Sequence, residues 1–459
     1  MNHAYKTSLR ALLLAFAVLM NGSAVAADLQ IAFFETDATP PVGSPLAYKE
    51  MERAAAPLSC RGVVLTGNGL PVVLCAIDWI GIANDGYEAW RAGLAEAAGT
   101  IPERVSVHTL HQHDAPVCDF SANDLLAEHG LGGVMFDPLF ARETIHRAAE
   151  SLRASMDHLQ TVTHIGTGQA KVEKVASNRR ILGADGKVAH VRWTATTDPA
   201  VAAAPAGTID PYVKLISFWG ENGPLGILSY YATHPQSYYL TGIANPDFPG
   251  MARNIRQHTT EIMQIHFNGA GGNIGAGKWN DGSHENRAVL AYRLAEGMKK
   301  AWAETIKEPI TASALGWRVL PVALPARGTL NASDLEAKIR DRSAPIPERT
   351  EAACSLAWLR RCQQGDTIDL TCLELGRVRI LSLPGECVVE YQLAAQAFQP
   401  ELFVAVGGYT DYAPGYVCLE EHYSQGGYED SPAASRVAPQ VEGALMPAIR
   451  ALLQPNRTK

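Results

Sequence analysis

The sequence of 459 residues predicts an α/β fold in which mixed β-sheets are flanked by helices. Segments of strand character alternate along the chain with helical segments, as in folds that cover a sheet with helices. Several of the strands are apolar throughout, which is typical of strands buried on both faces. The composition is that of a globular chain, since 47% of the residues are hydrophobic and 19% are charged.

The expected strands are short and are bounded by residues that favour turns. The stiff turn Thr39–Gly43 follows the first strand, and the turn Gly67–Gly69 joins the second strand to the third. In chain order, the expected strands are Gln30–Phe34, Gly62–Leu65, Val72–Ile77, Val105–His111, Val213–Phe218, Gly226–Tyr230, Met263–Phe267, Val378–Leu383 and Leu402–Val406.

Helices are expected between several of these strands. They cover Asp85–Ala98, Arg142–Met156, Asp247–Thr259 and Glu285–Thr305. The polar stretch Asn331–Arg349 contains proline, and we expect it to be an insertion or a crossing between domains.

Residues 1–26 are expected to form a signal peptide and not to be part of the fold. Lys6 and Arg10 precede the uncharged run Ala11–Met20, and the small residues Ala24–Ala26 form a typical cleavage site. The apolar run is too short to span a bilayer as a mature helix. We therefore expect an exported protein, periplasmic or secreted, with no transmembrane anchor after cleavage.

Charge and cysteine usage exclude two further classes. The chain has 39 basic and 47 acidic residues, a formal net charge of −8, and no basic run. Nucleic acid is therefore not an expected partner, because phosphate binding needs clustered lysine and arginine. The eight cysteines form no CxxC motif, which argues against a thiolate zinc site. Most are expected to be small buried residues, with up to three disulfides after export.

Metal-capable side chains follow three of the expected strands. His111 and His113 lie where a strand ends, and residues two apart in extended chain face the same side. His234 precedes a proline that restricts its backbone, and Glu386 follows a Pro-Gly turn. Sites in open α/β sheets gather at strand ends, and two histidines with a carboxylate are a usual catalytic zinc set. The alternatives are partly buried polar histidines and an acidic residue that favours a helix start.

A glycine-rich stretch, Phe267–Gly275, follows another buried strand. The letters from Gly272 onwards match the phosphate-binding pattern GxxxxGK, but Trp279 stands where serine or threonine should hold magnesium. Nucleotide binding is therefore not expected. The amides of Gly271 and Gly272 are candidates for stabilising an oxyanion in a small pocket, and the alternative is a glycine turn needed only for close packing.

Taken together, eight short motifs in a fixed order give the chain a resemblance to a known family. It resembles the catalytic domain of the neutral/alkaline (non-lysosomal) ceramidases, and most of all their bacterial ceramidase-like relatives. The resemblance covers nearly all of residues 27–459, which are expected to form a single domain. The motifs are Thr39–Gly43, HQHDAP at His111, Asn178-Arg179-Arg180, ATHP at His234, Asn245–Gly250, NGAGGNIG at Asn268, LPGE at Leu383 and GGYE at Gly426.

This resemblance implies zinc-dependent hydrolysis of an N-acyl bond and a role for each matching residue. His113 would lie beside the reacting centre, Arg179 on the substrate side and Tyr428 at the pocket rim. Tyr409 and Tyr412 match the family's tyrosine ligand less well than Tyr416 does. The zinc ligands implied are His111, His234, Glu386 and Tyr416.

The chain departs from the family in two respects. Gly275 stands where the family has a serine thought to act in acyl transfer. True neutral ceramidases continue into a C-terminal β-sandwich domain, whereas this sequence stops near where the catalytic domain is expected to end. We therefore expect an exported zinc hydrolase that cleaves the amide of a small or lipid-like N-acyl substrate by zinc-activated water. The alternatives are an esterase or carbohydrate deacetylase with the same metal centre, or a non-catalytic exported binding protein.

Overall fold

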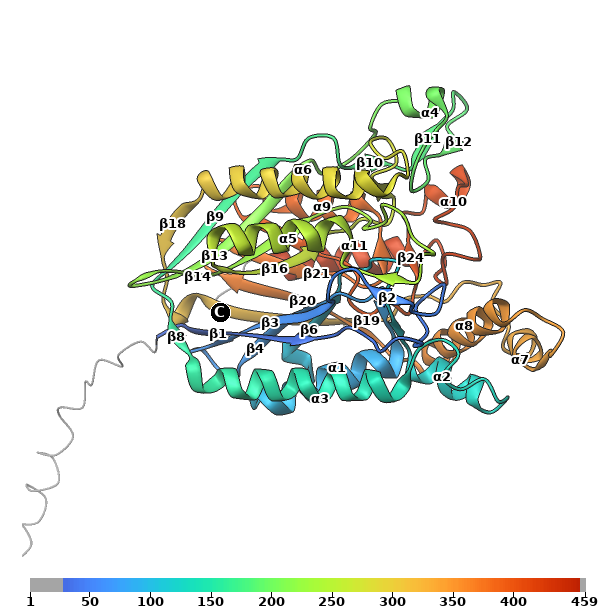
Figure 1. The fold of residues 1–459 in the computed structure, drawn as a ribbon, viewed down its shortest axis with the longest axis horizontal. Coiled ribbons are helices and arrows are strands. Elements are labelled where there is room, and N and C mark those ends of the chain that lie inside the picture. Colours follow the sequence, from blue (N-terminus) through green and yellow to red (C-terminus); the bar gives the residue numbers. More distant parts are fainter. Residues whose placement is uncertain (1–27, 455–459) are drawn as a thin grey trace, which may run out of the picture.

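The computed structural model of the chain describes residues 28–454, so the expected signal peptide lies outside the described residues. Three large sheets, each with helices on its outer face, make up the fold. Figure 1 shows the sheets stacked between α5 and α6 on one side and α1 and α3 on the other. The predicted α/β class, with mixed sheets flanked by helices, is confirmed.

All three sheets have the same arrangement: the two strands at one edge are parallel, and all other neighbouring strands are antiparallel. The first sheet, in the order β6-β4-β3-β1-β8, contains β1 (Gln30–Asp37), β3 (Ser59–Thr66), β4 (Val72–Ile77), β6 (Val105–Thr109) and β8 (Gln160–Thr161). The second, in the order β16-β14-β13-β9-β18, contains β9 (His164–Lys171), β13 (Tyr212–Gly220), β14 (Gly223–Tyr231), β16 (Met263–Asn268) and β18 (Ile306–Pro309). The third, in the order β19-β20-β21-β23, contains β19 (Leu315–Val322), β20 (Ile368–Leu375), β21 (Val378–Ser382) and β23 (Phe403–Gly407).

Five two-stranded pairs join the loops at the ends of these sheets. They are β2 (Arg53–Ala54) with β15 (Ile243–Ala244), β5 (Gly81–Ile82) with β7 (Val117–Cys118), β10 (Ser177–Asn178) with β17 (Ile274–Gly275), β11 (Arg180–Leu182) with β12 (Val188–Val191), and β22 (Glu386–Cys387) with β24 (Tyr416–Val417).

The helices cover the outer faces of the sheets or form the rim at one end. They are α1 (Asn84–Ala98), α2 (Phe120–Ala127), α3 (Pro138–Ser155), α4 (Pro199–Ala203), α5 (Asp247–Thr260), α6 (His284–Ala303), α7 (Ala332–Arg340), α8 (Ile346–Gln364), α9 (Val389–Phe398), α10 (His422–Gln425) and α11 (Val441–Leu453). Within residues 28–454, no helix combines the length and apolar character needed to cross a bilayer.

A central core forms where the inner faces of the three sheets meet. Successive strand residues point to opposite faces, so Val63 and Leu65 of β3 enter this core while Val64 packs toward α1 and α3. This is why the strands read as continuous apolar runs. The central core includes Leu74, Phe218, Leu228, Ile265, Leu373 and Ile380. The outer faces pack on α1 and α3, on α5 and α6, and on α9 and α11.

Most of the expected elements are present with shifted bounds, and α3 begins four residues before the expected Arg142. Two further differences are as follows. The strand expected to reach His111 ends at Thr109, and the stretch Asn331–Arg349 is helical, forming α7 and the start of α8. Asn331 caps α7 through its side chain. Pro345 is the N-cap residue of α8, and Pro347 lies in the first turn of that helix, where the missing N–H of proline breaks no helical hydrogen bond. A proline that suggested a break thus marks a helix start. All eight cysteines are free thiols, so none of the disulfides permitted by export is present.

Candidate functional site

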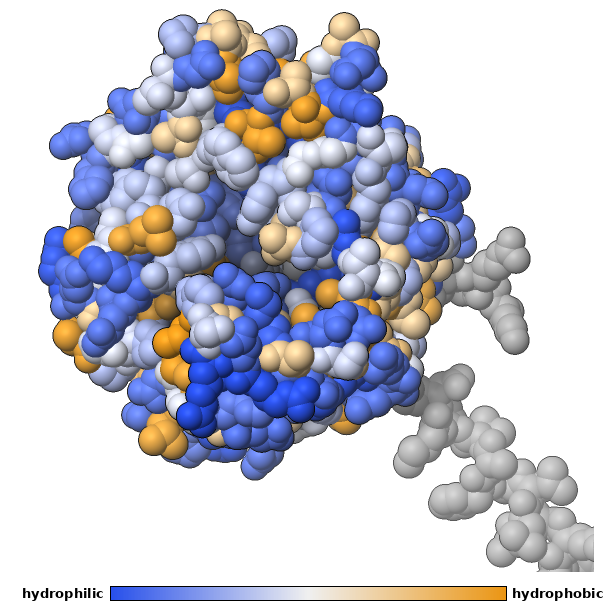
Figure 2. Space-filling view, turned by 90° about the vertical axis from the view of Figure 1, so that its right-hand side faces the viewer, coloured by the Kyte–Doolittle hydropathy of each residue, from blue (hydrophilic) through white to orange (hydrophobic). Residues whose placement is uncertain are grey.

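The candidate site lies where one strand of each sheet ends. His111 follows β6 of the first sheet, His234 follows β14 of the second, and Glu386 follows β21 of the third. These strands belong to the parallel pairs, whose carboxyl ends gather polar side chains as they do in open α/β sheets. Figure 2 views the molecule from the side on which β24 and α10 lie in Figure 1, and this face is hollowed near its centre.

A buried histidine, His108 on β6, links the three sheet edges beneath the site. Its Nε2 accepts a hydrogen bond from the amide of Asn268 at the end of β16 (3.0 Å), and its Nδ1 donates to the carbonyl of Gly408 after β23. This arrangement needs a neutral ring with one donor and one acceptor nitrogen. Burial lowers the pKa of His108 to about 3, so the ring is neutral at pH 7.

Acid is expected to destabilise the fold through His108 and through His266, whose pKa burial also lowers to about 3. The unfolded chain, with histidine pKa values of about 6.5, binds more protons than the folded chain below that pH. The stability contributed by the neutral rings is therefore complete above about pH 6.5 and is lost as the pH falls toward 3.

Urea unfolding at about pH 7 and about pH 5 would measure the loss. His266→Gln should reduce the loss and the control His146→Gln, at an exposed histidine, should not; an unchanged midpoint across this range would contradict the prediction.

His111 occupies a left-handed backbone conformation, with a φ of +63°. The alternation of an extended strand, which we expected to bring His111 and His113 together, is therefore not the cause of their proximity. Instead, the His111 amide donates to the carbonyl of Trp79 (2.8 Å) and Nδ1 donates to the carbonyl of Ile80 (2.5 Å). Because a carbonyl can only accept, Nδ1 carries a proton, and the neutral His111 ring then presents the lone pair of Nε2 to the site.

Three acceptor atoms converge at the centre of the site. Nδ1 of His234 faces the carbonyl of Gly271 (3.4 Å), and its Nε2 lies 3.2 Å from Nε2 of His111. Oε2 of Glu386 lies 3.3 Å from Nε2 of His111 and 3.7 Å from Nε2 of His234. Although Glu386 is only 2% exposed, Oε2 has no hydrogen-bond partner among the described residues.

This convergence fits a metal ion. Burial, together with the neighbouring histidines, lowers the pKa of His234 well below its usual value, so no imidazolium neutralises Glu386 from that side. Lone pairs so close together repel one another unless a cation lies between them. Tetrahedral ligands at about 2.0–2.1 Å from a metal are themselves about 3.3 Å apart, which matches the observed separations.

His113 belongs to the same buried cluster. Ligand atoms of His111, His113 and His234 all lie within 4.8 Å of one another. Nδ1 of His113 has no hydrogen-bond partner among the described residues, and its ring stacks on Tyr48 (5.8 Å between centroids, 9° between planes). Burial lowers the pKa of His113 well below its usual value, so the ring is a neutral base at pH 7.

Three tyrosines of the loop after β23 surround the carboxylate. The hydroxyl of Tyr412 donates to Oε1 of Glu386 (2.8 Å), and Tyr416 is opposite Glu386 in the parallel pair β22–β24. Burial acts to raise the pKa of Glu386, but His111 and the hydrogen bonds from Tyr412 and Tyr416 lower it overall. The ring of Tyr409 stacks on His111 (4.5 Å, 17°), and its buried hydroxyl has no partner among the described residues.

Arg179 brings a permanent positive charge to the wall of the site. Its Nη1 donates to the Tyr416 hydroxyl (2.9 Å), and its Nε lies 3.5 Å from Glu429. Burial acts to lower the pKa of Arg179, but Tyr416 and Glu429 raise it overall. The guanidinium lies over the ring of Tyr428 (5.2 Å) and near that of Trp193 (5.8 Å). A hollow of about 290 Å³ beside these two aromatic rings is otherwise lined mainly by residues of β12.

The glycines of the glycine-rich stretch lie against the ligand segments. The amide of Gly272 donates to the carbonyl of Cys387 (2.9 Å), so it is not available to a substrate oxyanion as expected. A Cβ atom at Gly272 would lie 2.3 Å from the carbonyl oxygen of Glu386, and one at Gly271 would lie 2.8 Å from the hydroxyl of Tyr409. At Gly272, glycine is therefore needed for close packing, which was the alternative to stabilising an oxyanion.

Gly272→Ala is expected to destabilise the protein by about 1–3 kcal/mol, because its methyl group would displace the backbone that carries Glu386. It should also weaken metal retention. Gly275→Ala is the matched control, since a Cβ atom there meets nothing closer than 3.8 Å. Urea unfolding and metal analysis of both variants would check this, and equal behaviour of the two would contradict it.

The sequence did not reveal the buried ion pair that supports the turn at His111. Asp78 follows β4, and its two oxygens bind Nη1 and Nη2 of Arg253 on α5 at 2.7 and 2.9 Å. The side chain of Gln112 donates to the backbone carbonyl of Asp78, and Asn268 donates to that of Leu110. The one local feature that could have indicated this ion pair is Asp78 itself, an acidic residue directly after an apolar strand.

Comparisons with known proteins agree with the fold. No protein-family model and no curated protein matches the sequence significantly. The crystal structure of neutral ceramidase from Pseudomonas aeruginosa matches with a TM-score of 0.67 and 18% identity, over 93% of this chain and 74% of that one. A ceramidase complexed with C2 matches with a TM-score of 0.65 and 17% identity, over the same shares. The chain therefore has the fold of neutral ceramidase, as the motifs predicted.

Proposed function

We propose that the protein is a zinc-dependent hydrolase of an N-acyl (amide) bond. The observation that carries this proposal is the convergence of His111 Nε2, His234 Nε2 and Glu386 Oε2 on one point. Two histidines and a carboxylate are a usual ligand set for catalytic zinc, and Tyr416 is the candidate fourth ligand. When bound, zinc supplies Lewis acidity and makes water a nucleophile at neutral pH.

The surrounding side chains suit the proton and charge movements of amide cleavage. His113 is a neutral base beside the proposed ligands, so it can accept a proton from the nucleophile and deliver it to the departing amine. Arg179 has the permanent charge needed to stabilise an oxyanion. A serine nucleophile is missing at Gly275, which favours direct attack by water over an acyl-enzyme.

The substrate class we propose is a lipid-like N-acyl compound. The hollow beside Trp193 and Tyr428, close to Arg179, would accept an apolar group next to the reacting amide. The similarity in fold to ceramidases supports this class. Export to the periplasm or the medium remains part of the proposal and rests on the residues before Ala27.

Metal analysis and substrate profiling would test this function together. We expect about one zinc ion per chain, loss of activity on chelation, and recovery when zinc is restored. A panel of N-acyl and O-acyl compounds should show preference for the amides. Preference for esters would replace the amidase by an esterase or deacetylase with the same centre, whereas no zinc after reconstitution would favour a binding protein.

His113→Ala should separate proton transfer from metal binding. If His113 acts as acid and base, kcat/KM should fall by about 10²–10⁴-fold while the zinc content stays near that of the wild type. His284→Ala, at a histidine of α6 that contacts Tyr238 instead of the cluster, is the control and should retain activity. Loss of zinc from the His113 variant would show instead that this residue is a ligand.

A further inference from the structure

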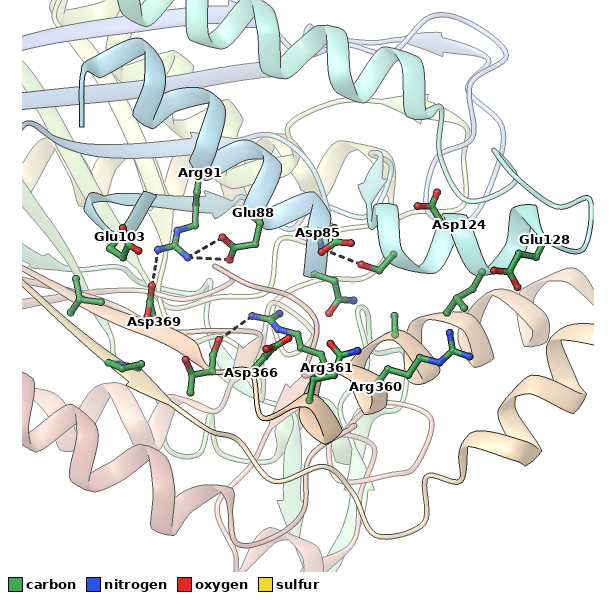
Figure 3. A pocket seen from close by; sticks show the side chains of 18 residues that line it. Asp85, Glu88, Arg91, Glu103, Asp124, Glu128, Arg360, Arg361, Asp366 and Asp369 are labelled. Atoms are coloured by element: carbon green, nitrogen blue, oxygen red, sulfur yellow. Dashed lines mark hydrogen bonds and ion pairs between the residues drawn. The ribbon is translucent and has the colours of Figure 1, made fainter. Parts of the chain in front are cut away.

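A cavity of about 860 Å³ between α1, α2, α8 and the strands β19 and β20 does not belong to the candidate site. Charged side chains line it (Figure 3), and two of its arginines are already ion-paired, Arg91 with Asp369 and Arg361 with Asp411. It shares no lining residue with the histidine cluster. The feature that the proposed function leaves unexplained lies closer to the metal centre, in the rings packed against His113.

His113 lacks the hydrogen bond that usually orients a histidine at a catalytic or metal site. Such a ring commonly gives one of its two nitrogens to a carboxylate or a backbone carbonyl, which fixes the direction of the other nitrogen. Nδ1 of His113 has no hydrogen-bond partner among residues 28–454, although the residue is only 5% exposed. The carbonyl of His111 lies nearby, but it is not placed to accept a hydrogen bond from this nitrogen. Another kind of contact is needed to hold the ring in one orientation.

Two tyrosine rings make that contact. Tyr48 stacks on His113 with 5.8 Å between ring centroids and 9° between planes, and Tyr239 meets His113 in a T-shaped arrangement at 5.4 Å. Tyr48 and Tyr239 also contact each other, with centroids 5.2 Å apart. Ring separations of about 4.5–7 Å in stacked or T-shaped geometry are favourable for aromatic pairs. The His113 ring is thus packed by two partners that also pack on one another.

Hydrogen bonds join the three loops that carry these rings. The two carboxylate oxygens of Asp114 accept from Thr241, one from its amide (3.0 Å) and the other from its hydroxyl (2.6 Å). The amide of Ala47 donates to the carbonyl of Ala115 (3.0 Å). Each of these residues lies within two positions of one of the three rings, so the backbone itself holds the ring cluster together.

We propose that Tyr48 and Tyr239 are positioning residues that orient the His113 ring for proton transfer, in place of the missing hydrogen bond. This inference rests on the proposed function, in which His113 moves the proton. Tyr48 is 50% exposed and covers one face of the buried His113 ring, so it also separates that face from bulk water. An acid–base group must lie within hydrogen-bonding reach of its proton, and a misplacement of about 1 Å can cost about 10²-fold in rate.

Kinetics of Tyr48 variants of the full-length protein on an N-acyl substrate would test the proposal. We expect Tyr48→Leu to lower kcat about tenfold, with KM changed less than about twofold and the zinc content unchanged. Tyr48→Phe keeps the ring and should retain kcat. Tyr292→Leu makes the same change at a tyrosine of α6 that is 63% exposed, and this control should leave kcat unchanged.

A double-mutant cycle with His113 tests whether Tyr48 acts through that ring. In the His113→Ala background, Tyr48→Leu should cause no further loss of kcat, because no imidazole is left to position. An equal loss in both backgrounds would overturn the proposal. A rise in KM at unchanged kcat would also overturn it, in favour of a direct contact between Tyr48 and the substrate.

A measurement that needs no substrate separates this test from that of the proposed function. In protein labelled with ¹³C at histidine, the ring signal of His113 is the one missing from the His113→Ala spectrum. Tyr48→Leu should move this signal because it removes the ring current of the stacked partner, whereas Tyr48→Phe should leave it in place. Absence of turnover by the wild type would refute the proposed function. A His113 signal that stays unmoved in Tyr48→Leu would overturn the positioning role, with or without turnover.

Discussion

Glu386→Gln is expected to abolish metal binding and to lower kcat/KM by at least about 10³-fold. The carboxylate supplies the anionic oxygen that faces both proposed imidazole ligands at 3.3 and 3.7 Å. Glutamine keeps the size of the side chain, and its amide oxygen can still accept from Tyr412, but the negative charge is lost. Elemental analysis and kinetics on an N-acyl substrate would measure both effects.

Glu390→Gln is the matched control for this prediction. Glu390 lies four residues further along the chain and accepts a hydrogen bond from Asn273 (2.9 Å), so the same chemical change is made close by without touching the cluster. It should retain metal and activity. A Glu386 variant with wild-type zinc content and full activity would rule out the proposed centre.

Asp78→Ala is expected to lower the free energy of unfolding by about 3–5 kcal/mol. Asp78 and Arg253 are each 1% exposed, and removal of the carboxylate would leave a buried guanidinium without its charge partner. The effect should reach the site, because the backbone carbonyls of Asp78, Trp79 and Ile80 accept three hydrogen bonds from His111 and Gln112. Weaker zinc retention should accompany the loss of stability.

Denaturant titration at neutral pH would measure this loss. Glu143→Ala provides the comparison, because Glu143 pairs with Arg147 at the same distance of 2.7 Å but is 67% exposed. That change should cost less than about 1 kcal/mol. Equal costs for the two variants would show that the buried pair does not support the fold.

Local patterns in the sequence were sufficient to predict many of the elements and part of the site. β4 has the predicted bounds, Val72–Ile77, because its burial on both faces leaves an unbroken apolar run. The placement of His111, His234 and Glu386 after strands was also visible, since a polar residue that ends such a run is a local feature.

Contacts between distant segments could not be read in the same way. Tyr416 faces Glu386 through the pairing of two-residue strands, and only the family resemblance pointed to it. Asp78 and Arg253 are 175 residues apart, and nothing near either residue indicates its partner. The left-handed turn at His111 depends on carbonyls of another loop, which is why the strand was predicted two residues too long.

The origin of the three proposed ligands in three different sheets has a consequence for how the chain folds. His111 and His234 alone are 123 residues apart, so the site is built from contacts of high sequence separation and appears only when every sheet has docked. An ion that binds the assembled state and not its fragments stabilises that state by its binding free energy. Unfolding of the whole chain then becomes more cooperative. If the proposed metal binds, its capture would follow the docking of the sheets, and the ion would act as a non-covalent cross-link present in the complete molecule and in no partly docked intermediate.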